Sequence, residues 1–150
     1  MKNFMNEAIK LAKKACAQGE VPIGAVIVYD GKIISRGYNT RQTSQNAIKH
    51  AEIIAIEKAC KKLGSWRLED CEIFVTLEPC PMCAGAIANA RIKTLHYGCK
   101  EQTSCDDLCE KILSSKRLNH TVEIIFEENY QEEISSLLSN FFKSKRQKNG

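Results

Sequence analysis

The sequence lacks any long apolar run. A helix needs about 20 consecutive apolar residues to cross a bilayer, and the longest apolar stretches in these 150 residues are short ones such as residues 25–28. The first four residues, Met-Lys-Asn-Phe, also lack the apolar core of an export signal. We therefore expect no membrane association, no secretion and a cytoplasmic location.

The composition is that of one folded domain. Hydrophobic residues make up 43% of the chain and charged residues 27%, and no repeat or low-complexity segment interrupts it. A domain of this length buries roughly 70% of the surface that its unfolded chain exposes, so its core is large enough to fold without disulfides. We expect a single domain over residues 1–150.

The net charge of +4 is concentrated at one end of the chain. Residues 141–150 hold four basic side chains and no acidic one, which leaves 18 basic against 18 acidic residues elsewhere. The sequence therefore predicts a basic C-terminal tail from about residue 143. Such a tail is either a solvated end or a contact for phosphates, and charge alone favours the solvated end. The four cations are Lys143, Lys145, Arg146 and Lys148.

Eight cysteines are many for a chain of this length. An even number is typical of a disulfide framework in secreted proteins, but no export signal supports that interpretation here. In a reducing compartment, isolated cysteines behave as small buried hydrophobes, whereas cysteines clustered near a histidine indicate a metal site. The spacing of the cysteines therefore decides between these interpretations.

Apolar periodicity predicts alternating helices and strands. Asp30-Gly31 lies between two β-rich runs and predicts an antiparallel hairpin. The expected helices cover residues 3–18, 50–63, 81–92, about 106–113 and 130–142, the expected strands 23–29, 32–38, 72–77, 94–98 and 121–126, and the expected loops 39–49 and most of 100–120. The pattern predicts an α/β fold, a three-layer α-β-α sandwich whose five-stranded mixed sheet has parallel later strands and an antiparallel first hairpin.

Two short segments carry the residues with the most chemistry. His50-Ala51-Glu52 opens one expected helix, and Pro79-Cys80-Pro81-Met82-Cys83 stands where a strand gives way to another. Cysteines three apart on a first helical turn share a face, and the amino end of a helix favours thiolates. Soft sulfur together with one imidazole points to zinc, held by His50, Cys80 and Cys83.

Glu52 gives this metal site a catalytic interpretation. Three protein ligands leave the fourth tetrahedral position for a water whose pKa zinc lowers to about 7. A carboxylate near the start of the same helix can take the proton of that water and pass it to a leaving group. The pattern of His-x-Glu followed by Pro-Cys-x-x-Cys is the signature of zinc-dependent nucleobase deaminases, so hydrolytic deamination is the favoured reaction.

Other interpretations of the same residues remain open. A Cys-x-x-Cys pair also occurs as a redox dithiol, which would explain neither His50 nor Glu52. A structural zinc site, as in a noncatalytic RNA-binding module, needs a fourth ligand and has no use for a proton shuttle. Residues that would supply that ligand, or a second metal site, are His96, Cys99, Cys105, Cys109 and His120.

The chain resembles the bacterial tRNA-specific adenosine deaminases almost from end to end. These enzymes belong to the cytidine/deoxycytidylate deaminase superfamily and convert the wobble adenosine of a tRNA anticodon to inosine. The zinc motif alone indicates only the superfamily, whereas the terminal helix with its basic end narrows the resemblance. The matching segments are 20–26, 37–39, 50–53, 67–68, 75–86, 119–123 and 137–142.

The resemblance implies a cytidine-deaminase-like fold, a homodimer and one Zn²⁺ per subunit. It also implies that a tRNA anticodon stem-loop is the partner and that the target base flips into the pocket. Asn39 matches the base-contacting asparagine of these enzymes, although an ordinary turn residue is the simpler interpretation of that position. Lys145 and Arg146 stand where the family carries basic residues that approach the anticodon stem.

The sequence departs from the family after residue 98. The family's Gly-x-x-Asp-x-Lys-x-Gly-Ala loop is replaced by residues 99–106, in which Glu101 keeps the acid and Thr103 replaces the lysine. Losing a cation weakens phosphate binding if this loop contacts RNA. The departure favours an alternative function, deamination of a free base or nucleotide such as guanine, cytosine or deoxycytidylate. Ile54 and the histidine ligand argue against the two cytosine-type substrates.

Overall fold

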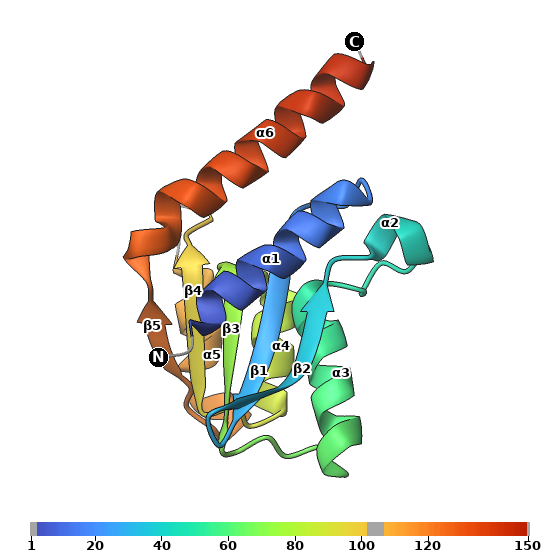
Figure 1. Ribbon diagram of the computed structural model, residues 1–150. Helices are drawn as coiled ribbons and strands as arrows, with labels where there is room; N and C mark the ends of the chain where they lie inside the picture. Colours follow the sequence, from blue (N-terminus) through green and yellow to red (C-terminus); the bar gives the residue numbers. More distant parts are fainter. Residues whose placement is uncertain (1–2, 102–106, 150) are drawn as a thin grey trace.

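A computed structural model of the protein describes residues 3–101 and 107–149, which form a five-stranded sheet covered by helices on both faces (Figure 1). The strand order is β2-β1-β3-β4-β5. β1 pairs antiparallel with β2 and β3, while β3, β4 and β5 run parallel. The strands are β1 (Gly24–Tyr29), β2 (Lys32–Tyr38), β3 (Cys71–Leu77), β4 (Thr94–Cys99) and β5 (Glu123–Phe126). This mixed sheet confirms the predicted fold class.

The main helices divide between the two faces of the sheet. α1 (Phe4–Ala17) and α6 (Gln131–Asn149) cover one face, where Met5, Ile9 and Ile134 pack on Val26 and Phe74. α3 (Ala51–Leu63), α4 (Pro81–Asn89) and α5 (Leu108–Leu113) cover the other. The helices on that second face begin close to the carboxyl ends of β3 and β4, the edge at which ligands bind in many α/β sheets.

Two glycines allow helices to approach the sheet closely. A Cβ on Gly37 would lie 2.3 Å from the carbonyl oxygen of Ala51, the first residue of α3. A Cβ on Gly98 would lie 2.5 Å from Cδ1 of Ile134 on α6. Real Cβ atoms do not come this close to other atoms. Because glycine has no side chain, the start of α3 can lie close to Gly37 and α6 can lie close to Gly98.

The segment from residue 39 to 49, expected to be a loop, contains the one-turn helix α2 (Arg41–Ser44). The buried Glu20 explains it, because its carboxylate accepts hydrogen bonds from the backbone N–H groups of Gln42 and Thr43 and from the Thr43 hydroxyl. An acid from a distant segment therefore caps this helix, as a side chain at its own N-cap position would.

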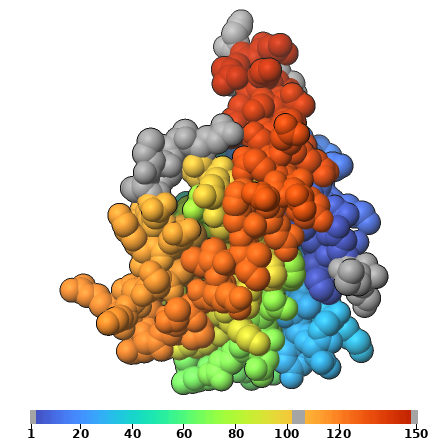
Figure 2. Space-filling model, turned by 90° about the vertical axis from the view of Figure 1, so that its left-hand side faces the viewer, coloured from blue at the N-terminus to red at the C-terminus, as the bar shows by residue number. Residues whose placement is uncertain are grey.

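The terminal helix is longer than the sequence pattern indicated. α6 continues to Asn149, so Lys143, Lys145 and Arg146 lie on a helix. In Figures 1 and 2 α6, drawn in orange to red, extends away from the sheet beyond the rest of the molecule. The remaining short elements are η1 (Lys116–Leu118) and η2 (Glu128–Tyr130). Within the described ranges, no helix combines the length and the apolar character that crossing a membrane requires.

Candidate active site

The predicted metal ligands come together at the starts of two helices. His50 occupies the N-cap position of α3, and Cys80 occupies the N-cap position of α4. Pro81 follows Cys80 at the first helical position, where its missing N–H leaves no hydrogen bond unmade. Cys83 lies one turn into α4 and is buried. Two positive helix ends therefore face one point, which stabilises anionic thiolates there.

The ligand atoms fit a metal ion geometrically. The Sγ atoms of Cys80 and Cys83 each lie 3.7 Å from Nδ1 of His50, and all three ligand atoms lie within 4.8 Å of one another. Ligand atoms bound tetrahedrally to zinc at its usual bond lengths are roughly 3.6 Å apart for a sulfur and a nitrogen. In the part of the chain that the structure describes, this is the only such group.

The two thiols differ in acidity. The hydrogen bond between them lowers the pKa of Cys80 to about 5 and raises the pKa of Cys83 above its usual range. The imidazole of His50 also lowers the pKa of Cys80. Soft sulfur ligands with one imidazole form a donor set that zinc accepts.

Glu52 lies beside the ligands but belongs to no ligand group. Its side chain is buried at the start of α3, with only 4% of the residue exposed. Burial raises the pKa of the Glu52 carboxyl to about 7, and the charge of Cys80 adds to this effect. A carboxyl group that titrates near neutrality is suited to both taking and giving a proton.

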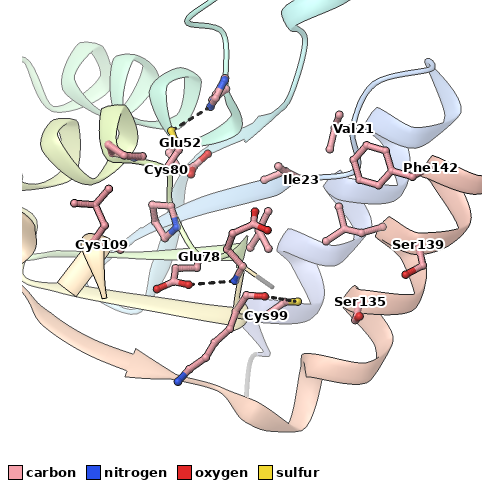
Figure 3. A pocket seen from close by; sticks show the side chains of 18 residues that line it. Val21, Ile23, Glu52, Glu78, Cys80, Cys99, Cys109, Ser135, Ser139 and Phe142 are labelled. Carbon is pink, nitrogen blue, oxygen red and sulfur yellow. Dashed lines mark hydrogen bonds between the residues drawn. The ribbon is translucent and has the colours of Figure 1, made fainter. Parts of the chain in front are cut away.

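A cavity of about 740 Å³ opens from the metal ligands toward α6 (Figure 3). His50, Glu52 and Cys80 form one end of it. The opposite wall comes from α6, whose Leu138 and Phe142 face the cavity with two serines. This volume is within the range of about 300–1,000 Å³ that small-molecule sites occupy. The other lining residues are Val21, Ile23, Leu77, Glu78, Pro79, Pro81, Cys99, Lys100, Glu101, Leu108, Cys109, Ser135 and Ser139.

The three residues expected to contact substrate lie around the cavity and do not line it. Asn39 is buried at the end of β2, where its backbone N–H donates to the carbonyl of the cavity residue Ile23 and its Oδ1 accepts from Arg41 N–H. Lys145 and Arg146 are exposed on α6, beyond Phe142. Nζ of Lys145 lies 5.6 Å from the ring centre of Phe141.

The other histidines and cysteines of the described chain lie outside the metal group. His96 contacts Glu72 through Nε2 at 2.8 Å and Glu127 through Nδ1 at 3.0 Å. Its ring therefore joins the start of β3 to the residue that follows β5. His120 contacts the carbonyl of Ile92. Cys99 and Cys109 line the cavity, and burial raises the pKa of both thiols, that of Cys109 to about 12. Cys105 lies outside the described residues.

Sequence reasoning missed two acids around the site, Glu20 and Glu78. Glu20 caps α2 in the segment that leads to His50. Glu78 lines the cavity directly before Pro79, and its carboxylate accepts a hydrogen bond from the Glu101 N–H. Two signals for them were present in the sequence. Each stands at the edge of a segment otherwise rich in apolar residues, and both lie in segments that match the deaminase family, 20–26 and 75–86.

The fold and the site define the class of the protein, a deaminase with a His-Cys-Cys metal group. The model of the MafB19-like deaminase family matches residues 1–146. The tRNA-specific adenosine deaminase of Bacillus subtilis (strain 168) is 47% identical over 146 residues, which cover 97% of this chain and 90% of the relative. The chain therefore belongs to the MafB19-like deaminase family and to the family of tRNA-specific adenosine deaminases.

Two solved structures extend the comparison. One comes from structural studies of A-to-I editing by tRNA:A34 deaminases at the wobble position of transfer RNA. It is 38% identical with a TM-score of 0.76, over 82% of this chain and 95% of the other. A guanine deaminase from Bacillus subtilis is 45% identical with a TM-score of 0.63, over 67% of this chain and 66% of the other. Both likenesses agree with the class that the site defines.

Proposed function

We propose that the protein hydrolyses the exocyclic amine of the wobble adenosine in a tRNA anticodon and so converts it to inosine. The observation that carries this proposal is the placement of Glu52 beside a three-ligand metal group at the end of a cavity. The names of the relatives support the choice of adenosine in tRNA as substrate.

The residues at the end of the cavity have distinct tasks. His50, Cys80 and Cys83 would hold Zn²⁺, one ion per subunit, and their number leaves one coordination position open. A zinc ion there would lower the pKa of a water molecule enough for it to lose a proton near neutral pH, and so would supply the nucleophile for the carbon that bears the amine. Glu52 takes a proton at one carboxylate oxygen and delivers it to the departing nitrogen, which leaves as ammonia. Burial of Glu52 keeps bulk water from competing for that proton.

Charge around the cavity supports an RNA substrate. Three acids, Glu52, Glu78 and Glu101, and one cation, Lys100, line the cavity, whereas the cations on α6 beyond it have no acid among them. The cations on α6 are Lys143, Lys145 and Arg146. Phosphates are repelled by the acids and attracted by the cations. A flipped base therefore enters the cavity while the backbone of the anticodon stem-loop follows α6. Asn39 completes the proposed set of substrate contacts, with Lys145 and Arg146.

The proposal includes a homodimer in the cytoplasm. Two apolar side chains next to the metal ligands, those of Ile48 and Met82, are 51% and 36% exposed. A second copy of the chain would cover them. The described cysteines are all free thiols, as a reducing compartment requires. Sedimentation of the protein at several concentrations tests the dimer.

Guanine deamination is the second candidate. The likeness to the guanine deaminase of Bacillus subtilis favours it, and the departure of residues 99–106 from the family pattern fits it. A free base would fill the metal end of the cavity and leave the α6 wall without a ligand.

Ammonia release from a panel of substrates separates the two candidates. The zinc-loaded protein is incubated with an anticodon stem-loop that contains a wobble adenosine and, separately, with free adenosine, guanine, cytosine and deoxycytidylate. The proposal predicts turnover of the stem-loop with no more than traces from the others. Turnover of guanine alone would replace the proposal with the second candidate, and no turnover of any substrate would favour a noncatalytic zinc module.

A further inference from the structure

We propose that Glu78 is a positioning residue whose carboxylate fixes the cavity wall formed by Lys100 and Glu101. The inference rests on the proposed function in so far as that wall contacts the RNA substrate. Glu78 belongs neither to the metal group nor to the proton path of Glu52. It acts through the backbone of the segment that follows β4.

Two hydrogen bonds join Glu78 to this segment. Its backbone N–H donates to the carbonyl of Cys99 at 2.8 Å, and its Oε1 accepts from the backbone N–H of Glu101 at 3.1 Å. The second bond is drawn in Figure 3, between the Glu78 carboxylate and the backbone beside Cys99. Together they hold the residues on both sides of Lys100, whose own N–H donates to Oε1 of Gln131 at 2.9 Å, so Glu78 supplies the contacts of this segment on the side of β3.

The backbone N–H of Glu101 bonds to a side chain because the pairing of β3 with β4 has already ended. β3 and β4 pair in parallel up to Leu77 and Cys99. Beyond Leu77 the chain of β3 passes into α4, whose N-cap is Cys80. The Glu101 N–H is a donor that needs an acceptor, and the Glu78 carboxylate, in place of a carbonyl of β3, accepts its hydrogen bond at the point where the cavity begins.

The same residue connects the cavity wall to the metal ligands. Glu78 is two residues before Cys80, so the bond to Glu101 ties the segment after β4 to the segment that carries a ligand. Its charge is also felt inside the cavity, because after burial it is the largest contribution that raises the pKa of Cys109. The inference requires only the acceptor oxygen of Glu78, and a neutral amide supplies one as well.

Glu78→Gln and Glu78→Ala test this inference in the full-length zinc-loaded protein. The exchange rate of the Glu101 amide hydrogen, measured by NMR, reports the anchor without any assay of activity. We expect exchange to be about tenfold faster or more in Glu78→Ala, because a hydrogen bond to a charged acceptor has been lost, and within about threefold of wild type in Glu78→Gln. Glu69→Ala, a change at an exposed acid paired with Arg67, serves as the control and leaves this rate unchanged.

Activity on the stem-loop gives the second readout. We expect Glu78→Ala to raise KM about fivefold, with kcat and zinc content within about twofold of wild type, and we expect Glu78→Gln to restore KM. Zinc loss in Glu78→Ala would overturn the inference, and so would a Glu78→Gln variant as defective as Glu78→Ala. If wild type itself fails to turn over the stem-loop, the proposed function fails, whereas the exchange rates still decide whether Glu78 anchors Glu101.

Discussion

Glu52 places one buried carboxylate in the candidate site. It lies in the first turn of α3, which follows the N-cap residue His50, and its carboxylate lines the cavity and forms a hydrogen bond with the thiol of Cys83. Nearby Glu57 lies on the same helix but is exposed, where it pairs with Lys49. Two acids of one helix thus have different surroundings, and burial is the largest cause of the raised pKa of Glu52.

Glu52→Gln is the sharpest change at this scale. Glutamine keeps the size of the side chain but cannot exchange a proton near neutral pH. We expect kcat to fall by about 10²- to 10⁴-fold while the zinc content, measured by atomic emission, stays at one per chain. Glu57→Gln is the matched control and keeps wild-type kcat. A Glu52→Gln enzyme with full activity would exclude the proton-transfer role.

Removal of a ligand tests the metal group. We expect wild type to bind one zinc per chain and Cys83→Ala to bind far less than one, because two remaining ligands do not hold the ion. Cys16→Ala, a change at a half-buried cysteine on α1, should keep the full zinc content. Two zinc ions per wild-type chain would show a second site and contradict the assignment of a single metal group.

At the residue scale, the short spacings in the sequence predicted that His50, Cys80 and Cys83 come together beside Glu52, and the structure brings these residues together. His50, Cys80 and Cys83 are close to helix starts that a pattern of apolar residues already locates. Glu20 and Glu78 escaped prediction because their partners are backbone N–H groups more than 20 residues away. Which N–H groups remain unpaired depends on how strands and helices end, and only the folded chain decides that.

At the scale of elements, the segment between β2 and α3 also has a structure that depends on a contact with a distant part of the chain. α2 has only four residues, too few for a helix that is stable by itself. Capping by Glu20 stabilises it. Burial tends to raise the pKa of Glu20, but the hydrogen bonds from Thr43 and Gln42 outweigh this and hold it below the usual value of 4.5.

This lowered pKa predicts how stability depends on pH. The unfolded chain binds a proton at Glu20 more readily than the folded one, so the contribution is complete above pH 4.5 and is lost as the pH falls through the lower, folded-state pKa. We expect Glu20→Gln to lower the free energy of unfolding by about 2 kcal/mol at pH 7, and by less in acid. Urea unfolding at both pH values measures this, and an equal loss at both would contradict it.

The start of α3 depends on Gly37. A methyl group at this position would meet the Ala51 carbonyl and the Ala55 nitrogen, which are backbone atoms that cannot rotate away. We expect Gly37→Ala to cost about 1–3 kcal/mol of stability and to weaken zinc binding, since α3 must shift with His50 on it. Gly85→Ala is the control, because a Cβ there has open space. Unchanged zinc affinity in Gly37→Ala would show that α3 does not depend on this contact.

Elements with a local signal were predictable from the sequence. The Asp30-Gly31 turn predicted the hairpin, and both residues have the positive φ that such a turn requires. α6 was expected to end near residue 142 because its apolar stripe ends there, yet the helix continues to Asn149. Its last two turns lack an apolar stripe, so periodicity gave no signal for them.

At the scale of the whole molecule, α6 extends from the cavity that His50, Glu52 and Cys80 line to an exposed basic end. Its first half packs on the sheet through Ile134, its middle forms the cavity wall with Phe142, and its end carries Lys145 and Arg146. Under the proposed function, this one helix would set the distance between a base in the cavity and the phosphates outside it.

Salt dependence of RNA binding tests the role of the basic end. Each phosphate contact releases counterions, so log Kd rises with log salt concentration in proportion to the number of contacts. We expect Lys145→Ala and Arg146→Ala each to lower this slope by about one and to leave the zinc content unchanged. Lys10→Ala, a change on α1 at a lysine that pairs with Glu7, is the control and keeps the slope. Unaltered slopes in both variants would mean that α6 does not contact phosphates.

The central claim is that this metal group and Glu52 deaminate one adenosine of a folded tRNA. The most direct measurement is the inosine content at every adenosine of a full-length tRNA with a wobble adenosine, after incubation with wild type or with Glu52→Gln. The account predicts inosine at the wobble position alone, with wild type alone. Inosine at other adenosines, inosine formed by Glu52→Gln, or no inosine with an enzyme that releases ammonia from guanine would contradict it.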